Sequence, residues 1–178
     1  MTRSLRFREI DLDRDADICI QFRIDSFVES FGSAERFLRA AGKDAQNYVQ
    51  GLRAKNRDWP GSCVHAWLDD QIVGQIEVRR EPADPSRAHV LLYYLRPDLR
   101  GQGFSEQLDT YVVGLCRASG VHTTSLRVSP TNARAVAYYS KRGWHDRGPD
   151  TEHPDVHVME RRSDAASNVA PPPNERCS

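Results

Sequence analysis

A glycine-rich segment at residues 96–105 has the residue types that bind phosphate groups, since it reads Arg-Pro-Asp-Leu-Arg-Gly-Gln-Gly-Phe-Ser. Gly101 and Gly103 let the backbone bend so that successive N–H groups point into one concavity at the start of a helix, where the positive end of the helix dipole also lies. Arg96 and Arg100 can add charge-assisted hydrogen bonds. The pattern predicts a phosphate or diphosphate site, with an ordinary strand-to-helix turn as the alternative.

The segment lacks the residues that two common nucleotide-binding motifs require. A P-loop needs Gly-Lys followed by Ser or Thr, and the dinucleotide fingerprint needs a third glycine and an acidic residue on the next strand. Neither set is present here, so a different phosphate-bearing ligand is expected.

A second candidate motif spans residues 132–144, which read Asn-Ala-Arg-Ala-Val-Ala-Tyr-Tyr-Ser-Lys-Arg-Gly-Trp. Asn132 and Tyr139 are seven residues apart, so on a helix they share one face, about 20° from eclipsed. Ala135 between them leaves room, and the pair could flank one ligand. Packing against the core is the alternative role for both Tyr138 and Tyr139.

Together the two segments resemble the GNAT superfamily, the acetyl-CoA-dependent N-acetyltransferases. The diphosphate loop of that family has the pattern Arg/Gln-x-x-Gly-x-Gly/Ala, and residues 100–105 match it with Ser105 at the last small position. A second family pattern, N-x-x-A-x-x-F/L-Y-x-x-x-G-F, matches residues 132–144 with Trp144 in place of Phe. The resemblance extends over roughly residues 5–161.

The resemblance implies acetyl-CoA as co-substrate. Main-chain groups of residues 93–95 would pair with the pantetheine amides, and a backbone N–H near Leu95 would polarise the thioester carbonyl. Asn132 would bind the cofactor arm. The residues that would contact the cofactor are Tyr94, Leu95, Arg96, Arg100, Gly101, Gln102, Gly103, Phe104, Ser105, Asn132, Ala135 and Tyr138.

The same resemblance implies direct attack of a primary amine on the thioester. The Tyr139 hydroxyl would protonate the leaving thiolate, which suits a phenol because its ordinary pKa near 10 lies above that of a thiol. Many relatives carry a Glu where this chain has His89, and His89 could relay the proton of the amine. Glu77 on the preceding strand is a second candidate base. For both residues a structural hydrogen bond is the alternative role.

The acceptor is expected to be a small molecule that carries a primary amine, with a protein N-terminus or a lysine side chain as the alternative. By the resemblance, its pocket includes residues 25–32 and 148–155, where Asp150, Glu152 and Asp155 could attract a cation or simply be solvated. A non-catalytic acyl-CoA-binding or sensing module is the alternative function, and a pure interaction domain is a third. The chain is expected to act as a monomer or homodimer.

Hydrophobic periodicity indicates the elements that must position these residues. Spacings of two and of 3.6 residues predict strands at 5–9, 64–68, 72–78, 88–95, 123–128 and 156–159, and helices at 20–31, 44–56, 103–120 and 132–142. Their order is strand, two helices, three strands, helix, strand, helix, strand. We therefore expect an α/β fold in which helices cover a mixed sheet, with a strand-to-helix crossover at 95–103, and this agrees with the GNAT fold.

Composition narrows the function classes. The 178 residues predict one domain at 1–162 and a flexible tail at 163–178, which holds three consecutive prolines. Lys plus Arg and Asp plus Glu both number 25, which disfavours nucleic acid or a membrane surface as partner. Four scattered cysteines without a zinc spacing predict no metal and reduced thiols. With no apolar leader or long apolar run, a cytoplasmic protein is expected.

Overall fold

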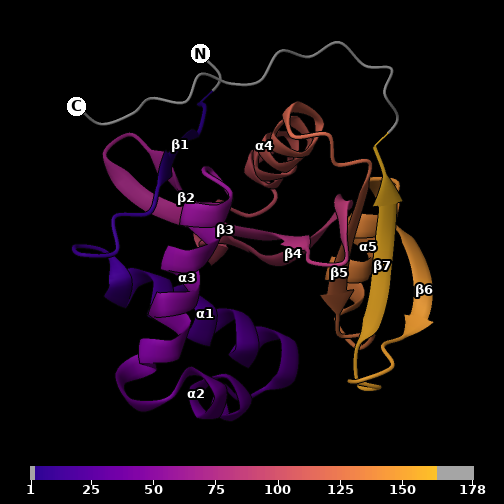
Figure 1. Cartoon of the computed structure of the whole chain (residues 1–178), viewed down its shortest axis with the longest axis horizontal. Helices are drawn as coiled ribbons and strands as arrows, with labels where there is room; N and C mark the ends of the chain where they lie inside the picture. The colour runs from indigo at the N-terminus through magenta and orange to yellow at the C-terminus, as the bar shows by residue number, and fades with distance from the viewer. Residues whose placement is uncertain (1–2, 164–178) are drawn as a thin grey trace.

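A computed structural model describes residues 3–163, which form a seven-stranded mixed sheet with helices on its faces (Figure 1). The strand order across the sheet is β1-β2-β3-β4-β5-β7-β6. In chain order the elements are β1 (Arg6–Glu9), α1 (Ala16–Phe31), α2 (Glu35–Ala41), α3 (Gln46–Asp58), β2 (Cys63–Leu68), β3 (Gln71–Glu81), β4 (Asp84–Leu95), α4 (Phe104–Ala118), β5 (Thr123–Val128), α5 (Ala133–Lys141), β6 (His145–Pro149) and β7 (His157–Arg162).

Strands β4 and β5 separate from each other part-way along the sheet. These two strands are parallel and pair only from Arg87↔Thr123 to Val90↔Leu126. On its other side β4 pairs antiparallel with β3 along its whole length, but Val90 faces Val78 while Leu92 faces Glu77. Leu91 is therefore the extra residue of a β-bulge, and a bulge bends the strand that carries it. The two strands diverge at this point, which opens a space at the centre of the sheet.

Helix α4 supplies the main core on one side of the sheet. Its buried residues Phe104, Leu108, Tyr111, Val112 and Cys116 recur at helical spacing and pack against the sheet. Residues of α5 join the same cluster. The helices α1, α2 and α3 contribute instead to three smaller clusters and lie together at one end of the molecule in Figure 1. The described residues include no helix that is both long and apolar enough to cross a membrane.

The structure confirms the mixed α/β fold expected from the sequence and adds two elements. The periodicity did not predict α2 or β6, and the second predicted helix is shifted to Gln46–Asp58. The last strand begins at His157 and runs to Arg162, beyond the predicted 156–159. The tail predicted at 163–178 lies outside the described residues, apart from residue 163.

Candidate active site

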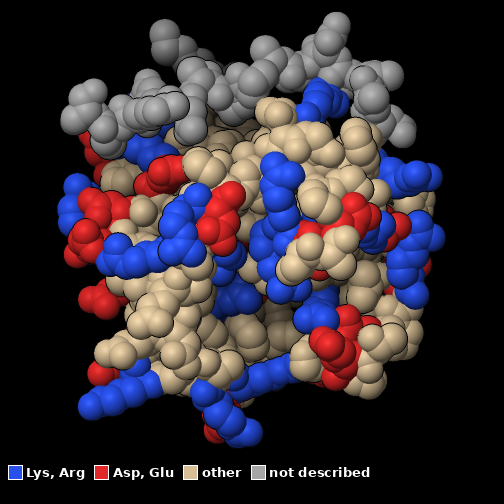
Figure 2. All heavy atoms as spheres, in the orientation of Figure 1, with Lys and Arg blue, Asp and Glu red and all other residues tan. Residues whose placement is uncertain are grey.

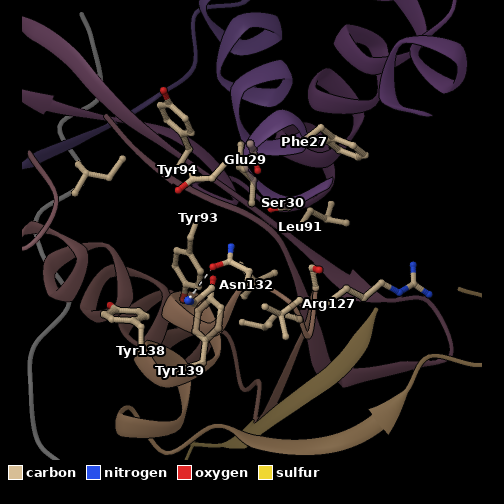
Figure 3. A pocket seen from close by; sticks show the side chains of 18 of the residues that line it. Phe27, Glu29, Ser30, Leu91, Tyr93, Tyr94, Arg127, Asn132, Tyr138 and Tyr139 are labelled. Carbon is tan, nitrogen blue, oxygen red and sulfur yellow. Dashed lines mark hydrogen bonds between the residues drawn. The ribbon is translucent and has the colours of Figure 1, made fainter. Parts of the chain in front are cut away.

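A cavity of about 750 Å³ lies where β4 and β5 diverge. Its walls come from both strands, from α1 and α2, from the N-terminal part of α4, from α5 and from the segment between β6 and β7. Figure 3 shows part of this lining. Figure 2 shows a hollow on this face, with basic atoms gathered around it. The predicted site residues that line the cavity are His89, Tyr94, Leu95, Arg100, Gly101, Gly103, Ser105, Asn132, Ala135, Tyr138 and Tyr139.

The glycine-rich turn presents unpaired N–H groups to this cavity. Gly101 and Gly103 have φ of 76° and 85°, a left-handed conformation that favours glycine, and a Cβ on either would meet no atom within 4 Å. In the described chain, the Arg100 N–H donates to the Pro97 carbonyl, and the next backbone N–H with a backbone acceptor is that of Glu106, which donates to the Gly103 carbonyl. The N–H groups of residues 101–105 are thus left without a backbone acceptor at the N-terminus of α4, where an anion can accept from them. We call this turn the anion cradle.

Arg100 adds charge to this cradle. Its Nε donates to the Leu95 carbonyl at 2.8 Å, and its Nη1 pairs with Glu29 Oε1 at 2.5 Å. The guanidinium is thereby held at the cavity wall between the end of β4 and α1. A phosphate group entering the cradle would compete with Glu29 for this cation.

Three residues predicted to contact the cofactor do not place their side chains in the cavity. Arg96 forms a bidentate ion pair with Asp98 at 2.9 and 3.1 Å. Gln102 donates to the Asp98 carbonyl at 2.8 Å, and Phe104 is 3% exposed in the main core. The turn directs these three side chains away from the cavity, so any contact of these residues with the cofactor would come from their backbone.

The free edge of β4 lines the cavity beyond the cradle. The carbonyls of Leu91 and Leu95 both point away from β3, since Arg23 Nη1 donates to the first at 2.5 Å and Arg100 Nε to the second at 2.8 Å. Successive residues of a strand direct their N–H and C=O groups to opposite edges. The main chain of Tyr93 therefore points to the same edge as Leu91 and Leu95, where β5 no longer pairs.

Asn132 and Tyr138 of the α5 region line the cavity and also make structural hydrogen bonds. Asn132 stands before the first helical turn and caps it, with Oδ1 accepting from the Ala135 N–H at 3.1 Å. Its amide NH₂ group is the part left for a ligand. The Tyr138 hydroxyl donates to the Ser105 carbonyl at 2.7 Å, so this side chain ties α5 to the start of α4.

Tyr139 lies between two aromatic side chains. Its ring centroid is 6.3 Å from that of Tyr93 and 5.9 Å from that of Trp144. Among the described residues its hydroxyl has no hydrogen-bond partner, and Figure 3 shows the side chain at the cavity beside Asn132. Burial raises the pKa of Tyr139 above its ordinary value of 10, so the hydroxyl keeps its proton at neutral pH.

The two candidate bases differ in position. His89 lines the cavity, is 7% exposed and has Nδ1 at 2.8 Å from Ser125 Oγ. Burial and then nearby arginines lower the pKa of His89 to about 4, so its ring is neutral at pH 7. Glu77 is 1% exposed and does not line the cavity. It accepts from Tyr48 Oη at 2.6 Å and lies 3.7 Å from Lys55 Nζ. These contacts make Glu77 part of a buried polar network.

Comparison with known proteins fits this geometry. A sequence model of the acetyltransferase (GNAT) family matches residues 24–144, about two thirds of the chain. The chain belongs to the GNAT acetyltransferase family. No curated protein sequence matches it significantly.

Solved structures show the same GNAT fold. A PaiA N-acetyltransferase from Thermoplasma acidophilum, in complex with coenzyme A, superposes with a TM-score of 0.72 at 16% identity, over 89% of this chain and 99% of that one. A GNAT acetyltransferase from Staphylococcus aureus gives 0.72 at 15% identity, over 90% and 99% of the two chains. A ribosomal-protein-alanine N-acetyltransferase from Brucella melitensis gives 0.68 at 19% identity, over 89% and 99%.

The far end of the cavity in this GNAT chain carries charges that the sequence did not reveal. Arg36 of α2 pairs with Asp155 at 2.9 Å, while Arg127 of β5 pairs with Asp150 at 2.9 Å and with Glu152 at 3.5 Å. All three acids of the 148–155 segment are thus already paired. The sequence left these acids as either a cation-binding group or a solvated loop, and in the structure two arginines that line the cavity already pair with all three of them.

Proposed function

We propose that this protein is an acetyl-CoA-dependent N-acetyltransferase that acts on the primary amine of a small molecule. GNAT membership supports acyl-CoA N-acyltransfer in general. The observation that carries the finer proposal is that an anion cradle with unpaired N–H groups and a tyrosine with an unbonded hydroxyl line one cavity. A diphosphate and a leaving sulfur are the two groups that such an arrangement would serve.

The cradle and the β4 edge would hold the thioester substrate. The N–H groups of residues 101–105 and the Arg100 guanidinium are suited to the diphosphate of coenzyme A. The coenzyme A in the PaiA structure supports this choice. The main chain of Tyr93 would pair with a pantetheine amide as an added strand would, and the Asn132 NH₂ group would donate to the same arm. The acetyl group would then lie near Leu91, at the bulge.

The chemistry proposed here is direct acyl transfer. The amine nitrogen bonds to the acetyl carbon, the C–S bond breaks, and the sulfur takes the proton of the Tyr139 hydroxyl. The nitrogen loses one proton as it becomes an amide, and a proton from solvent restores the Tyr139 hydroxyl, so that the products are the amide and the free thiol of coenzyme A. His89 is neutral and at the wall, so it can hold a hydrogen bond to the amine, but its low pKa makes it a weak proton acceptor. The acceptor would therefore react as the free amine, with its proton lost to solvent. Positioning of the two substrates provides the main rate enhancement.

Replacing Tyr139 with Phe tests the acid role. We expect kcat to fall by about 10²- to 10⁴-fold, the usual contribution of a general acid, with the Kd for acetyl-CoA within about threefold of wild type. Coenzyme A release in a thiol assay and calorimetric titration measure the two quantities. Tyr111→Phe is the matched control, because the Tyr111 hydroxyl bonds to the Gly61 carbonyl at 2.9 Å and does not line the cavity. Equal loss of turnover and binding in Tyr139→Phe would argue against the acid role.

Acetyl-CoA binding without turnover across a broad amine panel would point instead to the non-catalytic acyl-CoA-binding module. Well-folded protein that fails to bind acetyl-CoA would refute the proposed function.

A further inference from the structure

The charged side chains that line the cavity are mostly cationic. They are Arg23, Arg36, Arg100, Arg127 and Arg134, against Glu29 and Glu106. Arg100 belongs to the anion cradle, and Arg134 follows Asn132 in the first turn of α5. The other three arginines come from α1, α2 and β5, at the end of the cavity away from the cradle.

Arg23 is the cation at this end that has no counterion. Arg36 and Arg127 pair with the three acids of the 148–155 segment, whereas no described carboxylate lies within 4.0 Å of Arg23. Its Nη1 donates to the Leu91 carbonyl, and its guanidinium carbon is 5.4 Å from the centroid of the Phe27 ring. A guanidinium has five N–H donors, so this half-buried side chain keeps donors for an anion.

The position of Arg23 brings such an anion close to the reacting groups. It contacts the main chain at Leu91, where β4 bulges and β5 stops pairing. Tyr93, which neighbours the Tyr139 ring, is only two residues further along this strand. An anion on Arg23 would therefore lie beside the place proposed for the acetyl group, within a few bonds of an attacking amine.

The electrostatic surroundings favour a negative group at this end. His89 lies in the same wall, and after burial the groups that lower its pKa are Arg79, Arg127 and Arg23, opposed by Asp150. Burial is the main cause of the low pKa of His89, and the three arginines act in the same direction, so their charge also disfavours a substrate with several ammonium groups and no anion.

We infer that the acceptor is an amine that carries a carboxylate next to it, in the manner of a small α-amino acid, and that Arg23 binds this carboxylate. Arg–carboxylate pairs are often bidentate, and the planar fork fixes orientation as well as charge. Bound in this way, the carboxylate anchors the acceptor while the neighbouring amine faces the thioester. This inference rests on the proposed N-acetyltransferase function and narrows its substrate class.

Matched substrate pairs test the inference on wild-type protein. Each amino acid, from glycine to phenylalanine, is compared with its carboxamide and its decarboxylated amine, with rates expressed per concentration of free amine because the three amines differ in pKa. We expect kcat/KM for the amino acid to exceed that of its partners by about tenfold or more, as for one charge-assisted hydrogen-bond pair. Coenzyme A release is the readout.

Variants at Arg23 link this preference to the side chain. Arg23→Gln should abolish the preference for the carboxylate, mainly through a higher KM for the amino acid, whereas Arg23→Lys should retain part of it. Arg39→Gln is the matched control, since Arg39 is exposed on α2 and does not line the cavity. The Kd for acetyl-CoA should stay unchanged in all three variants, which shows that each protein is folded.

Three results would overturn the inference while leaving the N-acetyltransferase proposal intact. The first is equal or faster acetylation of amides and simple amines, the second is a carboxylate preference that survives in Arg23→Gln, and the third is acetylation of polyamines alone. Failure of the whole panel with acetyl-CoA bound would also overturn it. Absence of acetyl-CoA binding would instead refute the proposed function itself.

Discussion

Gly103→Ala separates the conformational role of this glycine from its role in the anion cradle. Gly103 has φ of 85°, and the Cβ of an alanine would meet no atom within 4 Å. The cost to folding therefore comes from the left-handed backbone alone, about 1–2 kcal/mol. For a domain of this size we expect the melting temperature to fall by about 2–8 °C.

The effect on acetyl-CoA binding should be larger than this strain explains. Gly103 lines the cavity, so the added methyl group occupies the space that the phosphates would approach. Loss of one hydrogen bond from a backbone N–H to a charged oxygen costs about 1.5–3 kcal/mol, which corresponds to about 10- to 150-fold in Kd. Calorimetric titration with acetyl-CoA measures this change.

Gly120→Ala provides a closely matched control. Gly120 has φ of 70°, its Cβ would also meet nothing within 4 Å, and it lies beyond the far end of α4, away from the cavity. Both variants should lose similar stability, and only Gly103→Ala should lose affinity. If Gly103→Ala binds acetyl-CoA as tightly as Gly120→Ala does, the diphosphate does not lie on this turn and the site has been placed wrongly.

Three further predictions follow from the charged groups. Glu29→Gln removes the partner that a diphosphate must displace from Arg100, so calorimetry should show acetyl-CoA binding about two- to fivefold tighter, and weaker binding would contradict this competition. Burial and nearby arginines lower the pKa of His89 from 6.5 to about 4, so between these pH values the unfolded state binds a proton that the folded state does not. Urea denaturation should therefore show that the free energy of unfolding falls as the pH drops from 6.5 to about 4, and that it falls less steeply in His89→Gln. Glu77→Ala leaves the half-buried Lys55 ammonium, the Tyr48 hydroxyl and the Gln75 amide without this carboxylate, and should cost about 3 kcal/mol in the same assay. The kcat of the folded fraction should stay near wild type, an outcome that a catalytic base would not allow.

The sequence predicted the cradle because its chemistry is local. Two glycines, an arginine and the start of a helix lie within six residues, and a turn of that kind forms largely by itself. The side chains of Arg96 and Gln102 both bond to Asp98, a choice that the sequence could not settle because several nearby partners were open to each. Only the folded turn selects among them.

The distant parts of the site could not be predicted from spacing. Arg23 reaches the main chain of Leu91, which is 68 residues away, and no periodicity encodes such a contact. The ion pair of Asp155 could not be predicted for the same reason, since its partner Arg36 lies 119 residues earlier. Pairing across this distance depends on how α2 and the β6–β7 connection meet.

The two missed elements gave weak signals for physical reasons. Helix α2 is seven residues long and buries only Phe37 and Ala41, which is too short a stripe for helical periodicity to emerge. Strand β6 reads His-Asp-Arg-Gly-Pro at the edge of the sheet and is largely exposed. Edge strands often carry charged residues and proline, which keep other strands from pairing with them. The alternation of apolar and polar residues that predicts a strand is therefore absent from β6.

The short β4–β5 ladder also sets the mechanical character of this sheet. Four parallel residue pairs join β1–β4 to β5–β7–β6, and beyond them the two halves are held together by side chains of the main core cluster, which includes Val90, Leu126 and Met159. A small separation of β4 from β5 beyond this ladder breaks no ladder pairing between them, whereas a full separation would open the core cluster under α4. Amide protons of β5 beyond Leu126 should exchange with solvent before those of β3, and a ligand that bridges the halves should slow that exchange from both sides of the gap at once.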